Sequence, residues 1–231
     1  MPRYDRAPLR ASAVAVLWQT VSSMLVRSRG TKTPLRFGTL ALCAVAWTPS
    51  RAVAEPLPEP PEWGVPVAHS LGVFTGTRLA EAILYPDPFA ETDLGVLGRN
   101  YREAFTRPPL FDPDEAVFEW DGDPWTINVI GHGLLGSELY YRPRRCGFSV
   151  LAALAFAAGA SVVWEYAFEA NGVRPSALDL VYTPAVGLVL GEARFWAFGA
   201  AGSLRDPTWR AIVRAVVDPF GELERELGAV C

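Results

Sequence analysis

The chain has 231 residues, half of them hydrophobic, which is enough for one globular domain plus a short accessory segment. Its charge is unevenly divided: residues 1–54 carry eight basic side chains and one acidic one, a net charge of +7, whereas residues 55–231 carry 13 arginines and 24 carboxylates, a net charge of −11. Because so acidic a surface repels phosphate backbones, the composition argues against nucleic acids as partners.

The N-terminal segment has the pattern of an export signal. Basic residues between Arg27 and Arg36 precede the apolar run Phe37–Trp47, which is too short for a stop-transfer helix. The small side chains of residues 52–54 then provide a cleavage site. Met24 would be a more ordinary start for such a signal, and the alternative is an uncleaved N-terminal anchor. We therefore expect residues 1–54 to be an export segment and the protein to work in the periplasm or cell envelope.

The remainder of the chain is expected to be a linker followed by a single helical domain. Residues 55–70 are rich in Pro and Glu, which favours an extended linker. The domain would then cover residues 71–231. Its first helices are predicted over Leu71–Tyr85 and Leu94–Phe105, each ended by prolines. The segment Phe111–Trp120 is predicted to be irregular or extended.

The next predicted helix begins at an aspartate and a proline. Asp123 is a good N-cap, and Pro124 suits the first helical position. The pattern predicts a helix to about Tyr141, stopped by Pro143.

An apolar segment follows. Residues 147–164 carry no charge, and this length reaches the threshold for a membrane span, but the segment is rich in alanine and fits a buried bundle helix equally well. The helix is expected to continue to Glu169 and to end at Asn171-Gly172. A second apolar segment, residues 180–190, leaves the same two alternatives. Both segments are candidates for contact with a membrane or lipid.

The C-terminal third contains the clearest helix signals. Ser176 and Asp179 match a capping box, and Thr183-Pro184 is a second helix start or a kink. Gly187 and Gly191 are four residues apart, so one face of that helix admits close approach of another backbone. The last helices are expected over Thr208–Val217 and after Pro219. Together these patterns predict a mainly α fold: a small helical bundle with apolar central helices, preceded by the signal peptide and a Pro-rich segment.

Polar residues beside the apolar helices are candidates for chemistry. Asn128 and His132 are four residues apart on one predicted helix, and Tyr140 continues the stripe. Glu165 and Glu169 have the same spacing at the end of the apolar helix. Two like charges next to an apolar run need a proton, an arginine or a metal as a partner.

Three interpretations of these residues remain open. In the first, His132, Glu165 and Glu169 bind a divalent transition metal that activates water for hydrolysis of a lipid or cell-wall component. In the second, the protein is a hydrolase without a metal, and His132 is a general base oriented by a carboxylate.

The third interpretation is structural. The same groups would form a satisfied polar network in a scaffold or membrane-associated protein. The two glutamates would then pair with arginines among Arg142, Arg144, Arg145 and Arg174. Asp179 would be the reciprocal partner of the Ser176 cap. The further members of this network would be Asn128, Asp179, Glu192 and Tyr140.

Two other residue types leave questions open. An exported chain permits a disulfide between Cys146 and Cys231, but one buried and one terminal free thiol fit the sequence equally well. The second histidine, His69, lies near the linker and is interpreted as incidental.

Two blocks of residues resemble a known family. The first block comprises Asp123-Pro-Trp125, Asn128, His132, Gly136 and Tyr140. The second comprises Trp164-Glu165-Tyr166, Glu169, Pro175-Ser176, Asp179, Thr183-Pro184, Gly187 and Gly191-Glu192. Together they resemble a bacterial envelope family known as domain of unknown function 3943, over roughly residues 111–220. The chain departs from the family at Gly133, where a proline is usual, and in the stretch 142–145.

The resemblance implies export and an envelope setting, and it carries no activity. It also implies that the acidic residues and the histidine of both blocks form one unit. These residues are His132, Glu165, Glu169, Asp179 and Glu192.

Overall fold

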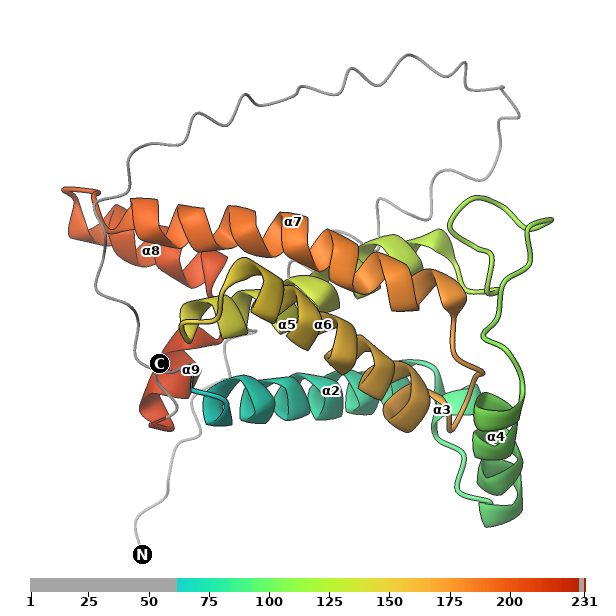
Figure 1. The fold of residues 1–231 in the computed structure, drawn as a ribbon. Coiled ribbons are helices and arrows are strands. Elements are labelled where there is room, and N and C mark those ends of the chain that lie inside the picture. Colours follow the sequence, from blue (N-terminus) through green and yellow to red (C-terminus); the bar gives the residue numbers. More distant parts are fainter. Residues whose placement is uncertain (1–61, 229–230) are drawn as a thin grey trace, which may run out of the picture. The chain divides into compact units, whose positions relative to one another are not determined.

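The structure, a computed structural model, describes residues 62–228 and residue 231 (Figure 1). The predicted export segment and residues 55–61 of the predicted linker lie outside the described residues. Within the described part the fold is mainly α, as predicted, and no strand forms there; Leu110 and Ser176 make one isolated bridge.

The elements follow one another as helices joined by loops, the longest of which covers residues 107–125. They are α2 (Gly64–Leu84), α3 (Pro86–Phe89), α4 (Leu94–Thr106), η1 (Thr126–Gly131), α5 (His132–Arg145), α6 (Val150–Val163), η2 (Trp164–Glu169), α7 (Ala177–Ala201), α8 (Pro207–Val217) and α9 (Gly221–Glu226). The elements η1 and η2 are π-helical turns that run directly into or out of an α-helix.

Most predicted helices lie where local signals placed them. Helix α4 begins after Asp93, whose side chain caps two backbone N–H groups, and α8 begins after Asp206, which does the same. Helix α2 ends at Leu84, before the prolines. It begins at Gly64, before the predicted start at Leu71, and so takes in the end of the segment predicted to be a linker.

Two predicted helix boundaries at prolines were wrong. Pro143 does not stop α5, because it lies in the last turn, where the Cys146 N–H closes the helix on the Arg142 carbonyl at 3.0 Å. Pro184 does not start a second helix either: α7 runs continuously through it.

Helices α5 and α7 pack with their backbones in close contact. A Cβ built on Gly136 would lie 2.0 Å from the Thr183 carbonyl oxygen, and one on Gly187 would lie 2.5 Å from the Gly136 carbonyl oxygen. A Cβ on Gly191 would meet the Tyr140 ring at 2.4 Å. The close approach predicted from Gly187 and Gly191 is therefore present, and the partner is α5.

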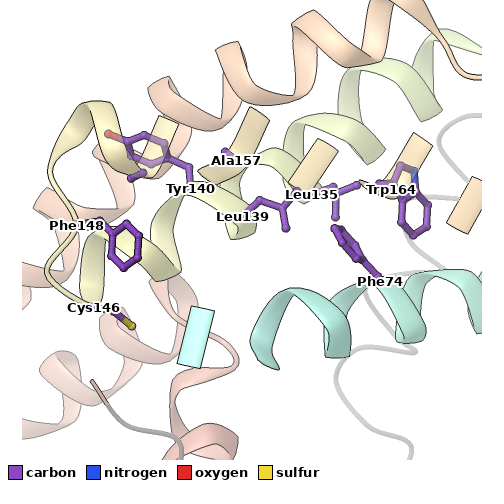
Figure 2. Packing of buried hydrophobic residues seen from close by; sticks show 9 residues of the cluster. Phe74, Leu135, Leu139, Tyr140, Cys146, Phe148, Ala157 and Trp164 are labelled. Carbon is purple, nitrogen blue, oxygen red and sulfur yellow. The ribbon is translucent and has the colours of Figure 1, made fainter. Parts of the chain in front are cut away.

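The hydrophobic core lies between α2, α5 and α6. Figure 2 shows Phe74 of α2 and Trp164, at the end of α6, with their rings facing each other; the ring centroids are 5.5 Å apart. Leu135 and Leu139 of α5 lie beside them. In Figure 1, α7 lies along α5 and α6 on the side opposite α2. Helix α5 is thus enclosed on several sides.

A disulfide bond ties the C-terminus to the core. Cys146, at the end of α5, is bonded to Cys231. This settles the choice between a disulfide and two separate thiols. The bond closes a loop that contains α6, α7, α8 and α9. Because that loop is long, the bond strongly reduces the conformational freedom of the unfolded chain.

Candidate functional site

The predicted site residues largely meet in one place, at the junction of α5, η2 and α7. We call His132, Glu165, Glu169 and Asp179 the polar centre. All four are buried, with at most 5% of any of these residues exposed. His132 begins α5, Glu165 and Glu169 lie in η2, and Asp179 lies in the first turn of α7.

Both halves of the centre involve π-helical turns. His132 follows η1 directly, and both glutamates belong to η2. A π-turn widens the helix and changes the direction of the side chains that follow, and such turns are common at functional sites. The sequence spacing predicted ordinary α-helical turns, so it could not predict the directions of the His132, Glu165 and Glu169 side chains.

His132 faces α7 through both ring nitrogens. Its Nδ1 lies 3.1 Å from Thr183 Oγ1, and its Nε2 lies 3.6 Å from Asp179 Oδ2. Burial lowers the pKa of His132 to about 4, although the charge of Asp121 acts in the opposite direction. The imidazole is therefore neutral at physiological pH and offers a lone pair.

Ser176 organises the start of α7, but not as a complete capping box. Its Oγ accepts a hydrogen bond from the Asp179 N–H at 3.2 Å, as predicted. The reciprocal bond was predicted wrongly: the Ser176 N–H donates to Glu165 Oε2 at 2.8 Å, not to Asp179. The Asp179 carboxyl is thereby released from capping and faces His132.

Asp121 is a member of the site that the sequence did not single out. Its Oδ1 accepts from Asn128 Nδ2 at 2.7 Å, and its Oδ2 accepts from Ser176 Oγ at 2.5 Å. Burial raises the pKa of Asp121, but the hydrogen bonds from Ser176 and Asn128 outweigh this and lower it overall. Asp121 is thus held ionised. Asn128, predicted to be a member of the polar network, is fully buried, and its side-chain amide holds Asp121 in place.

The other carboxyls behave in the opposite way. Burial, followed by the charge of Asp121, raises the pKa of Asp179 to about 9. Burial, with a smaller contribution from Asp179, raises the pKa of Glu165 to about 8, despite the Ser176 N–H. Burial and the charge of Glu165 also raise the pKa of Glu169. Each of these groups therefore needs a proton or a cation as its partner.

The same carboxyls leave oxygens without partners around a small cavity. Glu165 Oε1, Glu169 Oε2 and Asp179 Oδ1 are buried and make no hydrogen bond within the described part of the chain. The cavity has a volume of about 20 Å³ and is also lined by Arg174. Such a volume holds one water molecule or one ion.

A metal ion is one group that this arrangement could hold. Ligand atoms of His132, Glu165 and Asp179 all lie within 4.8 Å of one another. Glu169, which the sequence placed among the ligands, lines the cavity but is not part of this trio.

Glu192 and Tyr140 lie apart from the polar centre. The Tyr140 hydroxyl donates to Glu192 Oε1 at 2.7 Å, and Arg144 Nε donates to the same carboxylate. These side chains join α5 to α7 further along both helices. The predicted pairing is absent: in the described residues the two glutamates of η2 form no salt bridge with Arg142, Arg144, Arg145 or Arg174.

His69, interpreted as incidental from the sequence, belongs to a second buried cluster. Its Nδ1 lies 2.5 Å from Glu224 Oε1, and its Nε2 lies 3.4 Å from Glu138 Oε2. Arg142 Nη2 binds both Asp218 and Glu224, at 2.7 and 2.6 Å, and Arg194 Nη2 lies 2.7 Å from Glu138. We call this the ion cluster. With a carboxylate at each ring nitrogen, His69 is best accommodated as an imidazolium.

The ion cluster predicts that stability falls as the pH rises. Burial lowers the pKa of His69, but its contacts with Glu138 and Glu224 outweigh this and raise the pKa above the ordinary 6.5. The stabilisation from His69 is therefore fully present below pH 6.5 and is lost as the pH rises through the raised pKa. Urea unfolding between about pH 6 and pH 9 should show this loss.

The matched variant is His69→Gln, which should be less stable at low pH and should lose this part of the pH dependence. An unchanged slope in the variant would assign the pH dependence to other groups. The charged groups that act directly on His69 are Glu138, Arg142 and Glu224, and Arg194 and Asp218 pair with Glu138 and Arg142.

An apolar groove separates α2 from α6. It has a volume of about 660 Å³ and is lined mainly by Trp63, Leu71, Phe74, Phe156, Gly159 and Val163. Its one hydroxyl, that of Ser70, is already bonded to the Pro66 carbonyl at 2.8 Å. The groove therefore offers mainly hydrocarbon contact, and the indole N–H of Trp63 is the other polar side-chain group in its lining.

Comparison with known proteins agrees with the resemblance in the sequence. The model of the family described as Domain of unknown function (DUF3943) matches residues 117–220. No curated protein and no solved structure matches the chain. The DUF3943 segment contains the whole polar centre, with His132 on one side and both glutamates and Asp179 on the other.

Proposed function

We propose that this DUF3943 protein is an exported envelope protein with a non-catalytic role at a membrane, and that it contacts lipid through α6 and the adjoining groove. The observation that carries the proposal is the exposure of α6. The segment Val150–Glu169 is the single helix in the described part that is long and apolar enough to cross a membrane, yet only 28% of it is buried.

Exposed apolar side chains on α6 support lipid contact along one face. Leu151 is 75% exposed, and Val162 and Val163 are each nearly half exposed. The opposite face of α6 packs on α5 and α7. A helix of this kind contacts a bilayer with one face while the other face belongs to a polar, folded domain.

The groove extends this face to α2. Trp63 lies at one end of it, is 59% exposed, and packs edge-on against Phe148 with ring centroids 4.7 Å apart. An indole with an apolar body and a polar N–H is typical of membrane–water interfaces. The second predicted contact segment, residues 180–190, also exposes apolar side chains, Val181 and Val189, but they belong to α7 and do not line the groove.

The hydrolase alternative has less support from the geometry. A substrate would have to reach His132, which is 4% exposed, and the cavity lined by Glu165, Glu169 and Asp179 holds about one water molecule. The contacts of the polar centre join α5, η2 and α7, which is what a structural role requires.

Vesicle flotation tests the proposal. A chain that begins at Glu55, as after cleavage at the predicted site, is expected to float with neutral phosphatidylcholine vesicles. Leu151→Glu introduces a charge at an exposed position of α6 and should shift the protein to the bottom fraction, because burying a charge in hydrocarbon is costly.

The matched control is Val216→Glu on α8, whose side chain is 77% exposed but lies on a helix that packs on α7. This variant should float like the parent. A parent chain that stays at the bottom and forms a dimer in solution would contradict the proposal and assign the apolar face to a second copy.

A further inference from the structure

We propose that the polar centre binds one divalent transition-metal ion through His132 Nε2 and the carboxylates of Glu165 and Asp179. The site would be structural, joining α5, η2 and α7. The inference does not depend on lipid contact, because none of the three ligands lines the apolar groove.

The spacing of the ligand atoms is the first argument. His132 Nε2 and Asp179 Oδ2 are 3.6 Å apart, which is too far for a direct hydrogen bond. Two bonds of about 2.1 Å to a common ion span up to about 4.2 Å, so this separation fits two ligands of one ion. The whole trio lies within 4.8 Å, so the side chains would draw together by about 1 Å on binding.

The unpartnered oxygens are the second argument. Glu165 Oε1 and Asp179 Oδ1 are buried, accept no hydrogen bond in the described part, and belong to residues that are each 1% exposed. A buried carboxylate oxygen without a partner is strongly unfavourable. Both residues line the cavity of about 20 Å³, whereas His132 does not, so it is the spacing of the ligand atoms that associates the imidazole with these oxygens.

The surroundings already orient the ligands. Thr183 Oγ1 lies 3.1 Å from His132 Nδ1; when that nitrogen donates to it, the Nε2 lone pair faces Asp179. The Ser176 N–H holds the other oxygen of Glu165. Partners of this kind around a metal site fix the histidine tautomer and the ligand directions.

The carboxyls of the region outnumber the one cation that lines the cavity, Arg174, so the excess charge requires a further cation or bound protons. The salt bridges within residues 62–228 give Glu165, Glu169 and Asp179 no arginine partner. Asp121, held ionised by Ser176 and Asn128, adds another negative charge next to them. A divalent ion would balance two of these charges at once.

The donor set indicates the class of ion. One imidazole nitrogen with two carboxylates suits zinc, manganese or ferrous iron, whereas calcium and magnesium prefer oxygen ligands alone. The thiols of Cys146 and Cys231 are bonded to each other, so they do not compete for such an ion.

Metal titration of the full chain tests the inference. The protein for this experiment is made without a histidine-rich affinity tag. The substitution Cys43→Ser removes the one thiol that is not in the disulfide. After treatment with EDTA and dialysis against Zn²⁺ or Mn²⁺, elemental analysis should find about one ion per chain, and the melting temperature should rise with the concentration of the ion.

Conservative variants locate the ion. His132→Gln and Asp179→Asn should each remain folded by circular dichroism and lose the bound ion. Thr183→Val removes only the bond to His132 Nδ1 and should weaken binding by about 10–100-fold. Glu192→Gln, on the same helix but outside the polar centre, should bind like the parent.

Two results would overturn the inference. One is a folded parent that retains neither ion and shows no thermal shift with either, which would leave protons as the partners of the carboxyls. The other is undiminished binding in folded His132→Gln and Asp179→Asn, which would place the ion elsewhere. Loss of vesicle flotation would leave the metal result unchanged and would bear only on the lipid contact.

Discussion

Replacing Arg142 by alanine should lower the free energy of unfolding by about 3–5 kcal/mol, because it leaves two buried carboxylates without their cation. The Arg142 side chain is 7% exposed; its Nη2 binds both Asp218 and Glu224, and its Nη1 also donates to Asp218. Removing it leaves the ion cluster with three carboxylates against Arg194 and His69. Urea unfolding followed by circular dichroism measures the change.

Arg107→Ala is the matched control for this variant. Arg107 also pairs with a glutamate, Glu103, at 3.6 Å, but both side chains are at least half exposed. Loss of an exposed pair of this spacing should change stability by about 0.3–0.5 kcal/mol. If the two variants were equally stable, the ion cluster would contribute no more to the free energy of unfolding than a surface pair does. The burial of these charges between α2, α5 and the C-terminus would then need another explanation.

The helices could be predicted because their signals are local. Asp93, Asp206 and Ser176 cap N–H groups two or three residues along the chain, so each start is encoded next to itself. The two wrong proline predictions show where local signals are insufficient. The effect of Pro143 and Pro184 on a helix depends on the packing around it, which a local rule does not contain.

The polar centre could be predicted only in part. The spacing of Glu165 and Glu169 next to an apolar run, together with His132, identified three of its four members, and the family resemblance added Asp179. The role of Asp179 was missed because its expected partner, the Ser176 N–H, is taken by Glu165 from another helix. This change in the hydrogen-bond partner of the Ser176 N–H can be seen only in the folded structure.

Two contributors carried little signal in the sequence. Asp121 lies in a loop and its local sequence is typical of a turn, although Asn128 and Ser176 hold it against the site. His69 lies beside the predicted linker, and its partners Glu138 and Glu224 are separated from it by 69 and 155 residues. Contacts at such separations leave no local periodicity.

Gly136→Ala should be strongly destabilising, by about 3 kcal/mol or more, because the added methyl group would meet backbone and not a movable side chain. Its Cβ would lie 2.0 Å from the Thr183 carbonyl oxygen, and α7 could accommodate it only by moving away from α5. Urea unfolding gives the change in free energy.

Gly159→Ala separates this clash from the general effect of alanine in a helix. Nothing lies within 4 Å of a Cβ at Gly159 in α6, so this variant should be more stable than the parent by about 0.5–1 kcal/mol. The α5–α7 contact also sets the distance from His132 to Thr183 and Asp179. Any Gly136→Ala protein that still folds should therefore bind Zn²⁺ more weakly, whereas Gly159→Ala should bind it like the parent. Equal stability of the two variants would show that α5 and α7 tolerate separation, and the polar centre would then lack a fixed geometry.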